Sequence, residues 1–245
     1  MRKLVVCLSG AIVMALASCP AQAQQYQELD YFSESAGDLS IIFRGRQAER
    51  YDFTYNGNCF WKEAAYRVGD IVYRGKFYGG IELNLDAVLQ APLVRLDSGH
   101  VPIGLYASDV EYMKIGGSVY ENLRLKGHRE VKEGFYEILA DGEYRLYKRV
   151  DKRVETSVDN VNGPEIGYED PFYKDNIHTY FKYFPTYYLS HNGGPLVRFR
   201  NKGALMNFFP EHKKALRKHL SSISDSGVKL ENEESFIEIV KFVCQ

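Results

Sequence analysis

Histidine is the residue type most often used for metal binding and proton transfer, and the chain has six: His100, His128, His178, His191, His212 and His219. None belongs to a zinc-type spacing such as H-E-x-x-H or paired C-x-x-C motifs. His212 and His219 share one side of a predicted helix, but they flank Leu216, and two ligands seldom hold a metal without a third. We therefore predict no metal and no cofactor. We interpret His178 as a loop or hairpin residue rather than a general base.

Nucleophiles and acids are present without a recognisable catalytic motif. The chain has no G-x-S-x-G sequence. Cys59 with a distant histidine is a conceivable nucleophile pair, but its neighbours Phe60 and Trp61 favour a packed thiol. Four acids gather in one region without matching a calcium loop, and we interpret them as a solvated loop: Glu165, Glu169, Asp170 and Asp175. No catalytic residue is predicted. A secreted hydrolase, with its site assembled from distant segments, is the alternative hypothesis.

Aromatic residues are the most conspicuous candidates for binding. The chain has 19 Tyr and 14 Phe beside 1 Trp, and nine of these aromatics fall between residues 168 and 188. Tyrosines near Asp and Asn can stack on sugars or bind a peptide. The predicted binding residues are Tyr168, Phe172, Tyr173, His178, Tyr180 and Tyr183. The alternative is that these aromatics belong to one more hairpin, and the alternation through Tyr183 and Tyr187 favours it.

Strands must position these residues. From about residue 40 to 200 the pattern is strand, glycine-bearing turn, strand, which predicts an antiparallel meander, curled or partly closed. Within it, Ile81, Leu83 and Leu85 alternate with polar residues, which predicts one apolar and one wet face. The turn Asp141-Gly142 predicts a hairpin that pairs Tyr136 with Tyr147. Residues 151–185 are expected to be less regular.

Helices are predicted after Asn201, where the hydrophobic period changes toward 3.6. Pro210 suits the first position of one helix, and Asn232 is the predicted cap of the last helix. One helix carries a basic face of Lys213, Lys214, Arg217 and Lys218, which we interpret as solvated rather than lipid-binding. The fold class is therefore α+β, with a β-rich body at 24–200 and a helical segment at 201–245 packed on it.

The N-terminus has the pattern of a signal peptide. Arg2 and Lys3 precede an apolar run that is short for a membrane span, and an A-x-A site predicts cleavage after residue 23. A competing lipobox would instead make Cys19 a lipidated first residue. Removal of residues 1–23 changes the net charge from −1 to −3. Such a chain is not expected to bind nucleic acid, and no later segment is apolar enough to span a bilayer.

Two cysteines, Cys59 and Cys244, follow the predicted cleavage site. In an oxidising compartment they can form a disulfide that closes nearly the whole chain into one loop. Two separate free thiols are the alternative, and it is slightly favoured because sequence cannot show that the two Cβ atoms approach each other.

Several segments together resemble a family of secreted proteins from Bacteroidetes. The segments are Phe43-Arg-Gly-Arg46, Tyr55-Asn-Gly57 with Phe60-Trp61, Gly69-Asp70 with Tyr73-Arg-Gly75, Ile81-Glu-Leu-Asn-Leu-Asp-Ala87 with Leu93-Val-Arg95, Gly134-Phe-Tyr-Glu137 with Asp141-Gly142, Thr186-Tyr-Tyr-Leu189 with Asn192-Gly193, and Pro210-Glu-His-Lys-Lys-Ala-Leu216. The resemblance implies export to the periplasm, the outer membrane or the extracellular space, and it carries over no catalytic residue. We expect a non-enzymatic envelope protein that has a structural role or binds a partner, either another envelope protein or a glycan.

Overall fold

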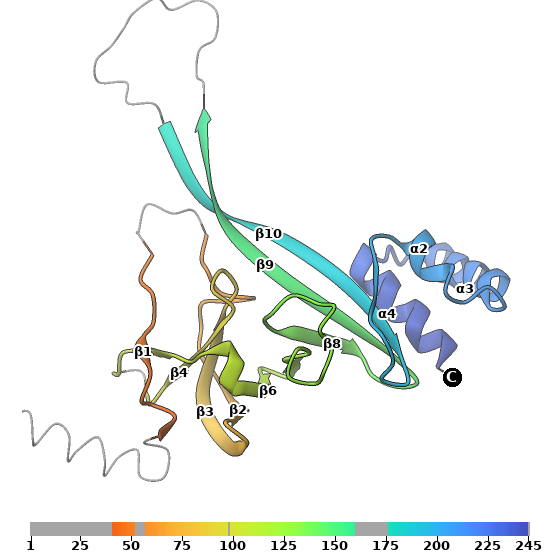
Figure 1. The fold of residues 1–245 in the computed structure, drawn as a ribbon. Helices are drawn as coiled ribbons and strands as arrows, with labels where there is room; N and C mark the ends of the chain where they lie inside the picture. The colour runs from red at the N-terminus through yellow and green to blue at the C-terminus, as the bar shows by residue number, and fades with distance from the viewer. Residues whose placement is uncertain (1–40, 52–56, 98, 160–175, 245) are drawn as a thin grey trace, which may run out of the picture. The chain divides into compact units, whose positions relative to one another are not determined.

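Short strands joined by tight turns build one antiparallel sheet (Figure 1). A computed structural model describes residues 41–51, 57–97, 99–159 and 176–244, with the side chains of all of these except residues 150, 157–159 and 176–178. The sheet has 11 strands in the order β1-β5-β4-β3-β2-β6-β7-β8-β9-β10-β11. They are β1 (Arg46–Gln47), β2 (Arg67–Tyr73), β3 (Lys76–Asp86), β4 (Ala91–Arg95), β5 (Ile103–Gly104), β6 (Val110–Ile115), β7 (Ser118–Glu121), β8 (Tyr136–Ala140), β9 (Tyr144–Asp159), β10 (Asn176–His191) and β11 (Val197–Phe199).

The predicted α+β class, an antiparallel sheet followed by a group of helices, is confirmed. Two of the predicted turns show why the chain folds this way. Between β2 and β3, Arg74 and Gly75 have φ of 51° and 73°, which is the left-handed conformation that a two-residue hairpin requires. Between β10 and β11, Asn192 and Gly193 have φ of 49° and 70°. The order of strands is linear, and β1 and β11 do not pair within the described residues.

Strand β3 differs from its predicted pattern on one face. The apolar residues Ile81, Leu83 and Leu85 are buried as predicted. The opposite face was expected to be wet, but Asn84 and Asp86 are also buried, at 5% and 2% exposure. The reason is that other segments cover them: the amide of Asn84 donates to the carbonyl oxygens of residues 63 and 65, and Asp86 accepts the hydroxyl of Tyr51 at 2.9 Å.

The long hairpin, which we define as β9 and β10, contradicts the less regular structure expected at 151–185 for residues 151–159 and 176–185, whereas residues 160–175 lie outside the described part of the chain. Its strands pair continuously from Tyr144 with His191 to Asp159 with Asn176. The predicted pairing of Tyr136 with Tyr147 is wrong, because Tyr136 lies opposite Arg149. The connection is longer than two residues and the register shifts between Ile138 and Ala140, which moves the pairing along the strand.

Alternation gives the long hairpin two sides. The helix-facing side includes Leu146, Tyr187 and Leu189, which pack with the C-terminal helices. The opposite side, which we call the basic side because it carries Arg149 and Arg153, includes Tyr147 and Tyr188. These two tyrosines pack in a second cluster with residues of β8, of the segment before β8 and of the loop before β11: Leu123, Val131, Tyr136, Ile138 and Leu196.

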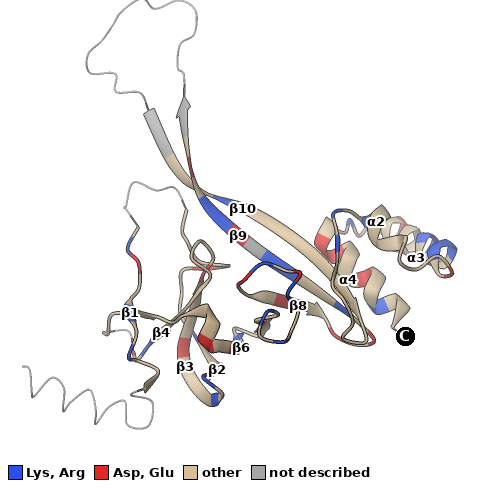
Figure 2. Cartoon of the chain, in the orientation of Figure 1, with Lys and Arg blue, Asp and Glu red and all other residues tan. Residues whose placement is uncertain are grey.

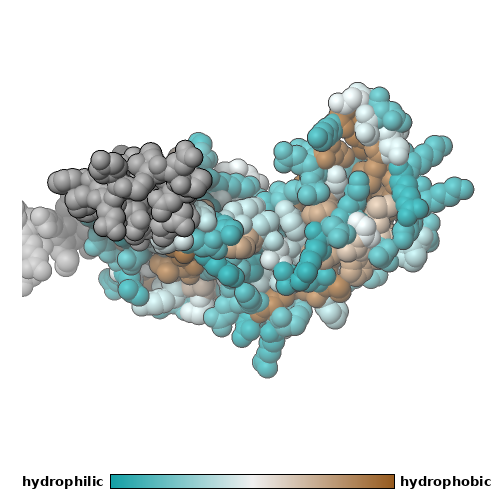
Figure 3. All heavy atoms as spheres, turned by 90° about the horizontal axis from the view of Figure 1, so that it is seen from above, coloured by the Kyte–Doolittle hydropathy of each residue, from teal (hydrophilic) through white to brown (hydrophobic). Residues whose placement is uncertain are grey.

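Three helices follow the sheet: α2 (Lys202–Met206), α3 (Lys213–Asp225) and α4 (Asn232–Val243). Phe236, Ile239 and Val240 of α4 are buried in the same cluster as Leu146 and Leu189 of the hairpin. At this end of the chain, hydrophobic side chains are flanked by hydrophilic ones (Figure 3). No helix in the described part of the chain is both long and apolar enough to cross a membrane.

Two of the predicted helix starts need correction. Pro210 is not the first residue of α3, because it lies in a turn and α3 begins at Lys213. Asn232 is the first helical residue of α4, and the cap is Glu231, which forms a capping box with Glu234. The carboxylate of Glu231 therefore serves the role that we expected of an asparagine amide.

Candidate functional site

The sequence-predicted binding residues fall into two groups. Tyr168, Phe172 and Tyr173 lie outside the described residues, as do Cys19 and the predicted signal peptide. His178 lies in β10 opposite Ser157, and only its backbone is described.

Tyr180 and Tyr183, also in β10, have different surroundings. The hydroxyl of Tyr180 donates to Glu155 at 3.4 Å across the hairpin. Tyr183 is 43% exposed and its ring lies 6.3 Å from that of Trp61. Tyr183 is thus partly packed in the hairpin and partly exposed, so its surroundings fit both the hairpin interpretation and the binding interpretation of the aromatic stretch.

A group of polar residues is buried on the helix-facing side. Glu137 is 5% exposed and accepts hydrogen bonds from Trp61 Nε1 at 3.1 Å, Lys62 Nζ at 2.6 Å and Ser118 Oγ at 2.8 Å. These three donors satisfy a buried carboxylate. Ser118 Oγ also accepts a hydrogen bond from Lys62 Nζ at 2.7 Å, so its hydroxyl is held within this network.

Lys148 extends this network to the helices. Its Nζ lies 2.6 Å from Glu233 of α4, and the same carboxylate accepts the hydroxyl of Tyr187 at 2.8 Å. Burial acts to lower the pKa of Lys148, but hydrogen bonds to Glu233 and Tyr183 outweigh it, so the pKa is raised. Lys148 stays charged and joins the sheet to α4.

Cys59 has the surroundings of a packed thiol. It is 7% exposed, and burial beside the carboxylate of Asp86 raises its pKa to about 12. A thiol is activated by a lowered pKa, so Cys59 is unreactive at neutral pH. Cys59 and Cys244 are both free thiols in the structure, the first buried and the second exposed, rather than joined in the possible disulfide.

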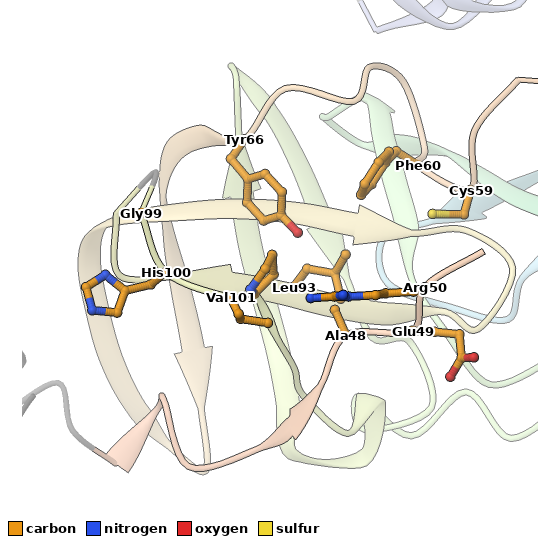
Figure 4. Close-up of a pocket in the computed structure, with 11 residues that line it drawn as sticks. Ala48, Glu49, Arg50, Cys59, Phe60, Tyr66, Leu93, Gly99, His100 and Val101 are labelled. Carbon is orange, nitrogen blue, oxygen red and sulfur yellow. The ribbon is translucent and has the colours of Figure 1, made fainter. Parts of the chain in front are cut away.

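No histidine stands beside Cys59 in the apolar cavity that both Cys59 and His100 line (Figure 4). His100 lies at the other end of the group and points away from the thiol. Its Nδ1 lies 2.8 Å from Asp97. Three further histidines lie at hydrogen-bond distance from acids: His128 from Glu130 at 3.2 Å, His191 from Glu143 at 2.8 Å and His219 from Glu238 at 2.7 Å. Among the described side chains, no group of three or more His, Cys, Asp or Glu could hold a metal ion.

The strongest candidate site is a hollow of about 280 Å³ on the basic side of the long hairpin, which we call the basic hollow. Four basic side chains and one acidic side chain line it: Lys132, Arg149, Arg153, Arg198 and Asp151. Figure 2 shows Lys and Arg along β9, in the middle of the hairpin. Lys132, Arg153 and Arg198 are exposed, and none of the three forms an ion pair within the part of the chain that the structure describes. The hollow therefore carries a surplus of positive charge.

Arg149 is the buried member of the basic hollow, at 5% exposure. Its guanidinium pairs with Asp151 and donates from Nη2 to the carbonyl oxygen of Glu133 at 2.6 Å. Its Nε has no hydrogen-bond partner among the described residues. An unpaired buried N–H costs roughly 1–3 kcal/mol, and such groups concentrate where a protein has another use for them.

Aromatic rings complete the hollow. The guanidinium of Arg153 lies 4.7 Å from the ring centroid of Phe184, which holds both side chains in place. Burial raises the pKa of Tyr188, and the nearby Arg198 and Arg149 oppose that rise. The hydroxyl of Tyr188 stays protonated at neutral pH. The hollow thus offers cations, hydrogen-bond donors and ring faces together.

Sequence reasoning missed the basic residues of this site, although one signal was available. Arg149, Asp151 and Arg153 are spaced by two, so a strand through them places all three on one side. The expectation of irregular structure after residue 150 hid that pattern. Lys132 and Arg198 could not have been added, because only the folded chain brings them to the hairpin.

Comparison with known proteins identifies no relative: the chain matches no protein-family model, no curated protein and no solved structure.

Proposed function

We propose that this chain is an exported, non-enzymatic binding protein that holds an acidic carbohydrate in the basic hollow. The observation that carries the proposal is the excess of cations around that hollow, four against one acid, beside the rings of Phe184 and Tyr188. Arginine is suited to carboxylate and sulfate groups, and aromatic rings stack on the apolar faces of sugars. Export, to the periplasm, the outer membrane or outside the cell, is part of the proposal and rests on the signal-peptide pattern at residues 1–23.

The exposed edge of β10 is a poor place for an added peptide strand, which favours a carbohydrate over a protein partner. Within the described residues, β10 pairs with β11 only at Tyr187–Leu189, so its edge from residue 179 to 186 pairs with no other strand. Pro185 lies in this stretch and has no N–H to donate to an added strand. A peptide strand added along this edge would lose a ladder hydrogen bond there. The side of the hairpin, rather than its edge, is the better binding surface.

We also propose that the sheet is curled. Register shifts occur in β2 between Gly69 and Ile71 and in β8 between Ile138 and Ala140. Such bulges bend a strand and increase its twist. A curled sheet would give the hairpin a concave side.

The test is a binding titration of the chain from Gln24 to Gln245. The ligands are polygalacturonate, chondroitin sulfate, neutral dextran and poly-glutamate. The variant is Lys132→Gln/Arg153→Gln/Arg198→Gln. The control is Lys214→Gln/Arg217→Gln/Lys218→Gln, which removes the same charge from the exposed face of α3.

We expect binding of one or both acidic polysaccharides, weakened about tenfold by the hollow variant and unchanged by the control. Equal weakening by both variants would show a non-specific charge effect and overturn the proposal. Tight binding of neutral dextran would show that binding does not need the cations, and it would overturn the proposal. Preference for poly-glutamate would indicate that the ligand is an acidic protein segment rather than a carbohydrate, and it would overturn the proposal.

A further inference from the structure

A second, chemically different cavity lies in the first half of the sheet (Figure 4). Its volume is about 340 Å³, and its apolar wall consists of Ala48, Cys59, Phe60, Leu93, Val101 and Pro102. It shares no lining residue with the basic hollow. A concave site of this size with an apolar wall and a few polar groups is typical of small-molecule binding.

Tyr66 supplies one of the polar groups. In Figure 4 its hydroxyl points toward the space between Phe60, Leu93 and Val101. Burial raises the pKa of Tyr66 to about 12, so the hydroxyl is a donor at neutral pH. Within the described part of the chain this hydroxyl forms no hydrogen bond.

The ring of Tyr66 is fixed from two directions. The guanidinium of Arg95 lies 4.4 Å from its centroid, and Arg95 is itself held by Glu82 at 2.7 Å. The ring of Phe60 meets it edge to face, with centroids 6.2 Å apart. A donor on a ring held in this way is preorganised, which lowers the entropic cost of using it.

Arg50 supplies the second polar group. Figure 4 shows its guanidinium extended toward Leu93 and Val101, on the same side as the hydroxyl of Tyr66. Glu49 and His100, the other ionisable groups of the lining, point away from that space. A cation and a hydroxyl donor facing an apolar wall match a ligand that is apolar along its length and anionic at one end.

We propose that this cavity binds a small amphipathic carboxylic acid, with its apolar body against Phe60, Leu93 and Val101 and its carboxylate toward Tyr66 and Arg50. The site goes beyond the proposed carbohydrate binding, because its ligand is of another chemical class.

Octanoate, measured by isothermal titration calorimetry on the chain from Gln24 to Gln245, is the probe. Octanol is its uncharged counterpart and butyrate its shorter one. The variants are Tyr66→Phe, which removes only the hydroxyl, Arg50→Gln, and Val101→Phe, which places a larger side chain in the cavity wall. Tyr112→Phe and Arg44→Gln make the same chemical changes at residues that do not line the cavity.

We expect octanoate to bind with a negative heat-capacity change and more tightly than octanol or butyrate. Tyr66→Phe and Arg50→Gln should each weaken it about fivefold, and Val101→Phe should abolish binding. The two controls should leave the affinity unchanged.

Three results would overturn the proposal: no binding of octanoate, equal binding of octanol, or an affinity that none of the cavity variants changes. If Val101→Phe does not fold, Tyr66→Phe still decides, because it keeps the packed ring. The hollow variant Lys132→Gln/Arg153→Gln/Arg198→Gln should bind octanoate normally. Failure of carbohydrate binding therefore stays separate from failure of this site.

Discussion

On its helix-facing side the long hairpin buries Lys148 against Glu233, whereas on its basic side the next residue, Arg149, lies among cations that outnumber their acids. The first side also holds Glu137, whose carboxylate meets three donors. The second side leaves Arg149 Nε without a partner among the described residues. Both sides are thus rich in charge, and they differ in how fully it is compensated.

The degree to which charged and polar groups are paired distinguishes a structural role from a binding role. A buried polar network stabilises a fold only when every member is satisfied. The helix-facing network meets that condition and connects the sheet to α4. The basic side does not meet it, and an acidic ligand would supply the missing charge. The following predictions test this difference.

The largest effect is expected from Glu137→Ala on the helix-facing side. The substitution leaves Trp61 Nε1, Lys62 and Ser118 without their common acceptor, at a cost of about 3 kcal/mol in the free energy of unfolding. Urea unfolding at neutral pH measures it. Glu133→Ala, at an exposed side chain, is the control and should change stability by less than about 0.5 kcal/mol. Equal effects would mean that the buried network is not what stabilises this side.

Alkaline pH should destabilise the protein through Cys59. Its pKa is about 12 in the folded chain and about 8.5 in an unfolded one. Below pH 8 the thiol is protonated in both states, and its contribution is fully present. As the pH rises toward 12 the unfolded chain loses this proton first, so stability falls, by about 2 kcal/mol at pH 10.

Comparison with Cys59→Ala isolates that contribution from those of the tyrosines. The loss of stability between pH 7 and pH 10 should be smaller in Cys59→Ala than in the natural chain. Cys244→Ala, at an exposed thiol, should behave like the natural chain. Iodoacetamide at pH 8 should modify Cys244 quickly and Cys59 only after unfolding.

A smaller effect is expected at Tyr183, which contacts the helix-facing network while 43% of it is exposed. Tyr183→Ala removes the contacts with Trp61 and Lys148 and should cost about 1 kcal/mol. Tyr180→Ala, which loses one long hydrogen bond to Glu155, should cost less. Thermal unfolding compares the two, and a larger loss at Tyr180 would reverse our assignment of which tyrosine is packed.

The smallest effect on stability is expected from Lys132→Gln/Arg153→Gln/Arg198→Gln. These side chains are exposed and form no ion pair within the described residues, so the free energy of unfolding should change by less than about 0.5 kcal/mol. Loss of ligand without loss of stability would complete the contrast with Glu137→Ala. A strongly destabilised variant would show instead that the basic side is also structural.

The fold could be predicted from sequence where local chemistry decides it. Arg74-Gly75 and Asn192-Gly193 specify their turns, and the alternation of Ile81, Leu83 and Leu85 specifies a buried face. The burial of Asn84 and Asp86 could not be predicted, because it depends on segments that reach them only in the folded chain. For the same reason the ring of Tyr136 meets that of Tyr188 edge to face, with centroids 5.6 Å apart, and Tyr136 does not lie opposite its expected partner Tyr147.

The candidate site shows the same limit. Arg149 and Arg153 were within reach of a strand pattern, but Lys132 and Arg198 come from other parts of the chain. Tyr66 and Arg50 carry no motif at all, and their common orientation appears only around the cavity. The binding roles of Tyr168, Phe172 and Tyr173 stay predictions. So do export and the family resemblance.

Pro185 has a further consequence for the behaviour of the protein at high concentration. An unpaired strand edge several residues long is a template on which identical chains can add to one another. Proline interrupts that template, and the charge of Lys182 on the same stretch makes stacking of copies unfavourable. The hairpin can therefore stay extended at high concentration without seeding aggregates.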